Sequence, residues 1–497
     1  MLNHAIKSSR WTKSIFIIYP LRHFSISRSN RFLNVIESVK KNAHRNGFND
    51  TSKNTDTWLI KNARAIRKFE ELMNKENPVE SFTVIPRNTR SGIKTSYWID
   101  DLIKKKYPKD ISGSFTIPKR VLTSKKMTDS YVEEFLPFKS DPDLLEDYIN
   151  SDGGIRVGMI FQDLDLFAKT IAFKHCENGN ADSFPLTLVT ASVDRLDLFN
   201  PIPIADIRLS GNVTHVGYSS MEVLIKMEAL EEGVLKNIQP RPEVNRDALP
   251  MCQSILNARF IMVARDPFTG RAAQVNSLQF ENEHQKRLFQ LGEEQKARRK
   301  AESASSLNKV PPTEEEKELI HKLFLEHNNF AGKQSNFVWM DETIMESVTL
   351  MSPQNRNIHG YVFGGYLMLL AYELAFSNAC LFLRSRPRFL ALDDISFRKS
   401  VPIGSILNMS SQIVYAPGPP HKSFQVAVKA DVIDFESEKR ETTNVFHFTF
   451  ASKDVDDVRR VMPKTYDEAL KYIEGKRHRN VGLKLRKLYA ESDIDSL

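Results

Sequence analysis

One stretch of this sequence decides the fold: Asn357-Ile358-His359-Gly360-Tyr361-Val362-Phe363-Gly364-Gly365. It leads into 366–383, a segment of 18 residues that is rich in Leu, Met and Ala, lacks Gly and Pro, and carries Glu373 as its only charge. Such residues favour a helix, and a helix that is apolar on nearly every side has to be buried. The segment is at the short limit for a membrane span and has an ionisable residue midway. We therefore predict a central helix wrapped by a sheet, and no membrane span.

Charge is concentrated at the start of the chain. The net charge is +8 over 497 residues, and the first 36 residues hold six Lys or Arg and no Asp or Glu, which leaves +2 for all the rest. The basic balance therefore gives no support to nucleic-acid binding. A leader that is rich in Arg and Ser and free of acidic residues is typical of a mitochondrial transit peptide, so we expect a matrix protein. The alternative is a disordered basic tail.

The three cysteines, Cys176, Cys252 and Cys380, are scattered and lack metal-ligand spacing. They indicate inert thiols in a reducing compartment. We accordingly expect no metal site and no cofactor.

Shifts in composition divide the chain into six segments. These are a transit peptide, 1–30; a polar, partly disordered region, 31–125; a first domain, 126–280; a charged helical linker, 281–335; a second domain, 336–463; and a helical tail, 464–497. The linker breaks near Pro311-Pro312, and its basic run, 296–300, is typical of a solvated helix face.

Hydrophobic periodicity predicts the elements of both domains. The first should contain a helix over 159–173 and strands over 186–196, 213–216, 221–227 and 255–264, with a hairpin turn at 217–220. The second should follow its central helix with strands over 389–397, 406–414, 424–432 and 445–450, with a turn at 416–420.

The chain contains the same unit twice. Asn150 and Gly158 recur as Asn357 and Gly365, in each case 207 residues later. Each half reads as a loop, a long buried helix, and strands joined by hairpin turns. This predicts duplicated domains with an α+β layout, in which an antiparallel sheet packs on one helix.

The motif that begins at Asn357, Asn-x-His-Gly-x-x-Phe-Gly-Gly-Tyr-Leu-Met, resembles the hot-dog acyl-coenzyme A thioesterases. Segments 156–165 and 260–266 resemble the mitochondrial double-hot-dog type. The resemblance covers about 126–463 and implies two tandem hot-dog domains joined by the charged linker. It also implies hydrolysis of fatty acyl-CoA to free fatty acid and CoA, and a homo-oligomer that is a trimer of two-domain chains.

In that family the catalytic acid lies seven residues past the second glycine of the motif. Seven residues past Gly158 is Asp165, so the first half keeps the acid. Seven residues past Gly365 is Tyr372, so the second half has lost it. The family's partner amide matches Asn357. The resemblance thus implies one composite site, with Asp165 as general base and Asn357 positioning the water or the thioester carbonyl, and a degenerate mirror site.

Thioester hydrolysis also needs donors for the developing oxyanion. Backbone N–H groups of Gly364 and Gly365 at a helix N-terminus, at the positive end of its dipole, can supply them. His359 has the pKa of a neutral-pH base. No Ser or Cys stands in a nucleophile-elbow context, however, so we expect His359 to hydrogen-bond locally in the substrate-binding loop.

Two other carboxylates compete with Asp165. Asp163 is about 200° away around a helix and cannot face the same groove. Glu373 is one residue out of frame in the second half, about 100° away, and we expect it to be a structural partner for an Arg or a backbone group.

Two other functions remain open on sequence grounds. A hot-dog hydratase would be expected to pair His359 with an adjacent carboxylate, which is missing. A non-catalytic acyl-CoA-binding or assembly subunit is the other, since one site has already decayed. Retention of Asp165 and Asn357 in complementary halves favours the enzyme.

Overall fold

The computed structural model describes residues 121–178, 186–198, 200–233, 253–266, 270–304, 306–307, 309–329, 337–355, 361–397, 399–437, 439–453 and 458–494. The predicted transit peptide and all but the end of the polar region lie outside these residues. So do Asn357, His359 and Cys252.

The first half forms a sheet packed on one helix. Its strands are β2 (Val132–Pro137), β3 (Thr187–Val193), β5 (Asp206–Val216), β6 (Ser220–Ala229) and β7 (Gln253–Arg265), and its helix is α5 (Val157–Cys176). With β12 (Ile395–Ser396) from the other half, the sheet has six antiparallel strands in the order β12-β3-β7-β6-β5-β2. The predicted hairpin is confirmed, since the Gly217 N–H donates to the Ser220 carbonyl between β5 and β6.

The second half repeats this arrangement. Its strands are β10 (Met345–Leu350), β11 (Pro387–Leu392), β13 (Ile406–Tyr415), β14 (Ser423–Ile433) and β15 (Arg440–Ser452), and its helix is α9 (Gly364–Leu383). With β4 (Leu196–Asp197) from the first half, the order is β10-β13-β14-β15-β11-β4. The central helix and the antiparallel α+β layout were therefore predicted correctly.

Shorter elements and the remaining helices complete the described chain. They are β1 (Ser124–Lys126), α4 (Pro142–Tyr148), β8 (Ser277–Gln279), α7 (Glu283–Ala304), α8 (Glu314–Asn329), β9 (Phe337–Trp339), β16 (Arg460–Met462) and α10 (Tyr466–Ile494), with 3-10 turns at Thr128–Ser130, Met340–Thr343 and Pro353–Asn355. The pairs β1–β8 and β9–β16 are parallel, which the sequence did not predict.

The two halves exchange strands at their common edge. β4 pairs with β11 of the second half, and β12 pairs with β3 of the first half. The Leu198 N–H also donates to the Leu390 carbonyl, and the Phe397 N–H donates to the Ala191 carbonyl. Each half thus supplies a strand to the sheet of the other.

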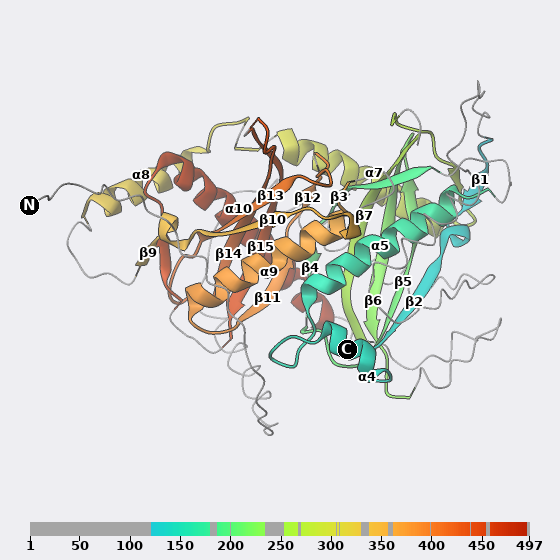
Figure 1. The fold of residues 1–497 in the computed structure, drawn as a ribbon, viewed down its shortest axis with the longest axis horizontal. Helices are drawn as coiled ribbons and strands as arrows, with labels where there is room; N and C mark the ends of the chain where they lie inside the picture. Colours follow the sequence, from blue (N-terminus) through green and yellow to red (C-terminus); the bar gives the residue numbers. More distant parts are fainter. Residues whose placement is uncertain are drawn as a thin grey trace, which may run out of the picture. The chain divides into compact units, whose positions relative to one another are not determined.

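Helices α5 and α9 lie side by side across the sheets, α5 in teal and α9 in orange in Figure 1. By length and composition α9 could cross a membrane, but 61% of its apolar window is buried inside the protein. Its side chains meet the sheet, as where Phe382 and Phe424 lie 5.2 Å apart. The apolar run is therefore the core of the second half.

Helix α10 covers the other face of the second sheet. Gly475 of α10 lies so close that an added Cβ would be 2.6 Å from Tyr415 Cβ and 3.5 Å from Gln425 Cβ. Gln425 follows Phe424, which faces α9, and successive strand residues point to opposite faces. α7 packs on β5 in the same way, with Gly292 against His215. Helix α7 from the predicted linker and helix α10 from the predicted tail thus play the same structural role, each packing on the outer face of one sheet.

We had expected the basic run of the linker, 296–300, to be a solvated helix face. The structure shows instead that part of this run pairs with carboxylates of the protein. Arg299 donates to Asp194 at 3.0 Å, and Arg298 lies 3.9 Å from Asp394. Because α7 lies against the sheet, one side of the helix is buried and its arginines pair with carboxylates there.

Candidate functional site

Asp165 of α5 lies at the junction of the two halves. This residue is 1% exposed. Oδ2 accepts hydrogen bonds from the Gly365 N–H and from Lys169 Nζ, each at 2.9 Å, and Oδ1 accepts from the Thr190 hydroxyl. The carboxylate of the first half is therefore held by the first turn of the helix from the second half.

The glycine at position 365 is what permits this contact. A Cβ there would lie 2.8 Å from Asp165 Cβ and 2.9 Å from Gln162 Cα, which is closer than real side chains approach. In the mirror position, a Cβ added at Gly158 would lie 3.4 Å from Leu369 Cα, where ordinary contact begins. The close approach is needed only where the acid is present.

The helix N-terminus is partly occupied by the acid. α9 begins after Phe363, which provides no side-chain cap, so its first N–H groups and its dipole point toward the junction. The Gly365 N–H, expected to hold the oxyanion, donates to Asp165 instead. Lys169 Nζ lies 4.2 Å from the centroid of the Phe363 ring and adds a positive charge beside the same turn.

Thr190 is the residue that sequence reasoning missed. It lies on β3 just before a bulge, opposite Met262 of β7, and its hydroxyl reaches Asp165. A Thr in a strand carries no signal of its own because β-branched residues are common there. Only the register of β3 against α5 would have identified it.

The two competing carboxylates are accounted for by structural contacts. Asp163, 2% exposed, accepts a hydrogen bond from the Tyr148 hydroxyl at 2.7 Å on the first half's own side. Glu373 forms an ion pair with Arg156, which precedes α5. The prediction that Glu373 pairs with an arginine is therefore confirmed.

The mirror position is filled with aromatic rings. Tyr372 is 7% exposed and lies 5.6 Å from Phe161 and 5.3 Å from Phe389, measured between ring centroids. Burial raises the pKa of the Tyr372 phenol well above its ordinary value, so the hydroxyl stays protonated and cannot act as a base. Phe389 precedes the bulge of β11 as Thr190 precedes that of β3. Asp165 and Thr190 of the first half thus have aromatic counterparts in the second half.

Comparisons with known proteins converge on one class, although no family model matches the chain. It is 38% identical over 400 residues to mitochondrial acyl-coenzyme A thioesterase 9 of Mus musculus, covering 78% of this chain and 85% of that protein. It is 39% identical over 368 residues to the Homo sapiens protein of that name, covering 72% and 79%.

Solved structures of similar proteins include an acyl-CoA hydrolase from Staphylococcus aureus in complex with butyryl-CoA and CoA. Its TM-score is 0.29 at 24% identity, over 32% of this chain and 98% of that chain. A putative oleoyl thioesterase from Lactobacillus plantarum has a TM-score of 0.38 at 7% identity, over 65% of this chain and 96% of that chain.

Proposed function

The chain belongs to the acyl-coenzyme A thioesterases and is an acyl-CoA thioester hydrolase, and we propose that it acts through one composite site with Asp165 as the general base. The observation that carries this proposal is the buried Asp165 carboxylate of one half, bonded to the first turn of the central helix of the other. Polar groups are rarely buried at such a junction unless they are held by specific partners.

The contacts of Asp165 set what the carboxylate does. An ionised carboxylate has about four lone-pair directions, and Gly365, Lys169 and Thr190 use three of them. We propose that the remaining direction accepts a proton from the attacking water. The Lys169 ammonium compensates the negative charge, which would otherwise be costly to bury.

The proposed reaction begins with that water and uses the groups around it in turn. Its oxygen attacks the thioester carbonyl carbon as Asp165 takes the proton, and the carbonyl oxygen becomes negative. The Gly364 N–H and the α9 dipole stabilise this oxyanion. Asn357 positions the carbonyl or the water, and His359 forms a hydrogen bond within the same substrate-binding loop. The C–S bond breaks, and the leaving CoA thiolate receives the proton that Asp165 took. The mirror site does not hydrolyse, because Tyr372 cannot accept a proton.

The wider organisation is also part of the proposal. We propose two tandem hot-dog domains over 126–280 and 336–463, and a trimer of such chains. Supporting the assembly, the sheet edge at β10 exposes Val348 and Leu350 to 67% and 63%. The mitochondrial names of the relatives support a mitochondrial location, and we propose the matrix, with 1–30 as the transit peptide.

The test is thiol release from short-, medium- and long-chain acyl-CoAs, with protein that starts near Ser25. Asp165→Asn should lower kcat/KM at least about a hundredfold, since it removes the general base. Asp163→Asn is the matched control, two residues along the same helix, and should stay within a few-fold of the parent. Equal activity of Asp165→Asn and the parent would refute the assignment of the base. Binding of acyl-CoA without hydrolysis by the parent would instead favour a binding subunit.

A further inference from the structure

Three side chains with metal-ligating atoms meet where α10 crosses β15, and the proposed hydrolysis uses none of them. They are His447 of β15 and Glu474 and His478 of α10, and one ligand atom from each lies within 4.8 Å of the other two. The two imidazole rings are stacked, with 4.6 Å between centroids.

The backbone brings these groups together. Glu474 and His478 are four residues apart, so they lie on the same face of α10. Gly475, between them, lets the helix approach the sheet closely, since any Cβ there would meet Tyr415. His447 points out of β15 toward that helix, between Phe446 and Phe448, which point into the core.

His478 is oriented as a metal-binding histidine usually is. Asp393 Oδ1 lies 3.5 Å from His478 Nδ1, and Asp393 is itself paired with Arg195. A metal-binding histidine commonly donates its other ring nitrogen to a carboxylate in this manner. The Asp393 N–H donates to the His447 carbonyl at 2.9 Å, which fixes the strand. Within the described part of the chain, His447 Nδ1 is buried with no hydrogen-bond partner, and such a group is unusual in a native protein.

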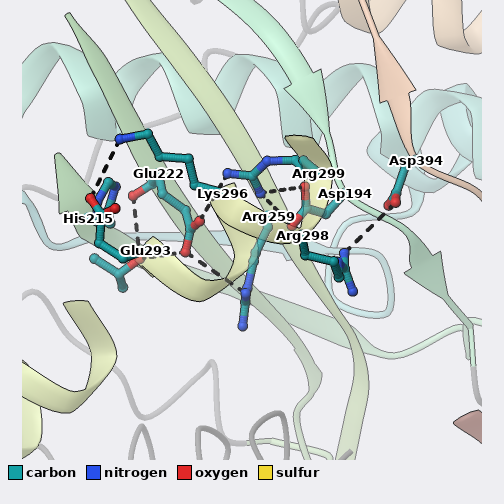
Figure 2. A network of polar contacts seen from close by, with 10 residues as sticks. Asp194, His215, Glu222, Arg259, Glu293, Lys296, Arg298, Arg299 and Asp394 are labelled. Carbon is teal, nitrogen blue, oxygen red and sulfur yellow. Dashed lines mark hydrogen bonds and ion pairs between the residues drawn. The ribbon is translucent and has the colours of Figure 1, made fainter. Parts of the chain in front are cut away.

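The first half provides an internal comparison at the same place in the fold. There the Asp194 N–H donates to the Arg259 carbonyl at 3.0 Å, so Arg259 is the counterpart of His447. Figure 2 shows how the negative charges of Asp194 and Glu222 are balanced there. Arg299 pairs with both carboxylates, and Arg259 lies near Glu222. Arginines hold the helix to the sheet in the first half, whereas two histidines and a carboxylate stand there in the second.

We propose that His447, Glu474 and His478 bind one Zn²⁺ ion that ties α10 to the second sheet. Two imidazoles and one carboxylate suit zinc, whereas Mg²⁺ and Ca²⁺ require mostly oxygen ligands. Ligands at about 2.0–2.1 Å around a tetrahedral ion are about 3.4 Å apart. The three groups therefore need side-chain shifts of only roughly 1 Å to close on the ion. The fourth position would hold water, because the His478 side chain is 28% exposed and leaves a path for entry.

The test uses the full chain and Zn²⁺ alone, titrated by calorimetry, with Co²⁺ absorption in the visible range as a probe of tetrahedral geometry. We expect one Zn²⁺ per chain, and a rise in the thermal midpoint when zinc is added. His478→Gln should weaken zinc binding at least about a hundredfold and abolish the midpoint shift. Glu474→Gln, on the partly exposed helix face, should weaken binding without the risk of misfolding.

His215→Gln is the matched control, because His215 lies beside Gly292 under α7 in the first half and pairs with Glu293. It should bind zinc like the parent, as should Asp165→Asn, so the result does not depend on the hydrolytic site. The proposal is overturned if the parent binds no zinc, or if His478→Gln and Glu474→Gln, both folded, bind it as tightly as the parent.

Discussion

Replacing Gly365 by alanine should damage the site through a displacement that the structure lets us estimate. The new Cβ would be 2.8 Å from Asp165 Cβ and 2.9 Å from Gln162 Cα. Ordinary contact begins at about 3.4 Å, so α5 and α9 must separate by roughly 0.6 Å. Gln162 contributes backbone atoms, which cannot rotate away as the end of a side chain could.

That displacement acts directly on the general base. The Gly365 N–H to Asp165 Oδ2 distance would lengthen from 2.9 Å to about 3.5 Å, the limit of a hydrogen bond. Because a misplacement of about 1 Å can cost a hundredfold, we expect this smaller displacement to lower kcat/KM by about tenfold to a hundredfold. Overpacking should also cost about 1–3 kcal/mol of unfolding free energy.

Thiol release and urea unfolding would measure both effects. Gly158→Ala is the matched control from the mirror position, where the new Cβ would lie 3.4 Å from Leu369 and no acid is present. It should keep its activity and its stability within about 1 kcal/mol. If Gly365→Ala had the activity of the parent, the absence of a Cβ at position 365 would not be required for the correct placement of Asp165, and the reasoning would be refuted.

The remaining predictions concern the same framework. Thr190→Val should lower kcat/KM about tenfold or more by freeing Asp165 Oδ1, with KM little changed, as steady-state kinetics would show. Burial opposes ionisation of Asp393, but the Arg195 guanidinium outweighs it and holds the pKa of Asp393 well below its usual range. The stability that this carboxylate contributes is therefore present above its unfolded pKa of about 3.9 and lost as pH falls below it. Asp393→Asn should cost about 2 kcal/mol at neutral pH and flatten the loss in acid, measured by urea unfolding at several pH values. Gly211→Ala should cost about 2–3 kcal/mol, because its Cβ would lie 2.4 Å from a backbone oxygen of β6; a folded variant of parental stability would contradict the packing.

Much of the fold could be predicted from local pattern. The central helix followed from an apolar run without Gly or Pro, and the hairpins followed from alternating strands with turn residues between them. Counting from the glycines placed Asp165 at the junction and left Tyr372 in the mirror position, and the structure brings Asp165 to Gly365. Its role in catalysis stays a prediction.

The features that could not be predicted from the sequence depend mostly on contacts between segments that are distant in the chain. Thr190 became visible only through the register of β3. The edge strands β2 and β10, each before its helix, were missed because neither alternates between buried and exposed residues. β2 is buried or partly buried at every position, whereas β10 is exposed at most positions. The pairing of Arg299 with Asp194 joins residues 105 positions apart, and no local periodicity reports that distance.

The exchanged strands have a consequence for synthesis on the ribosome. The outer edge of β3 gains its partner β12, which pairs with Ser192 and Val193, only about 200 residues later in the chain. At about 5–20 residues per second, that edge stays open for about 10–40 s. During this interval the first half presents an unpaired strand edge to its surroundings. A nascent chain of this protein should therefore depend on holding chaperones until its last third has left the exit tunnel.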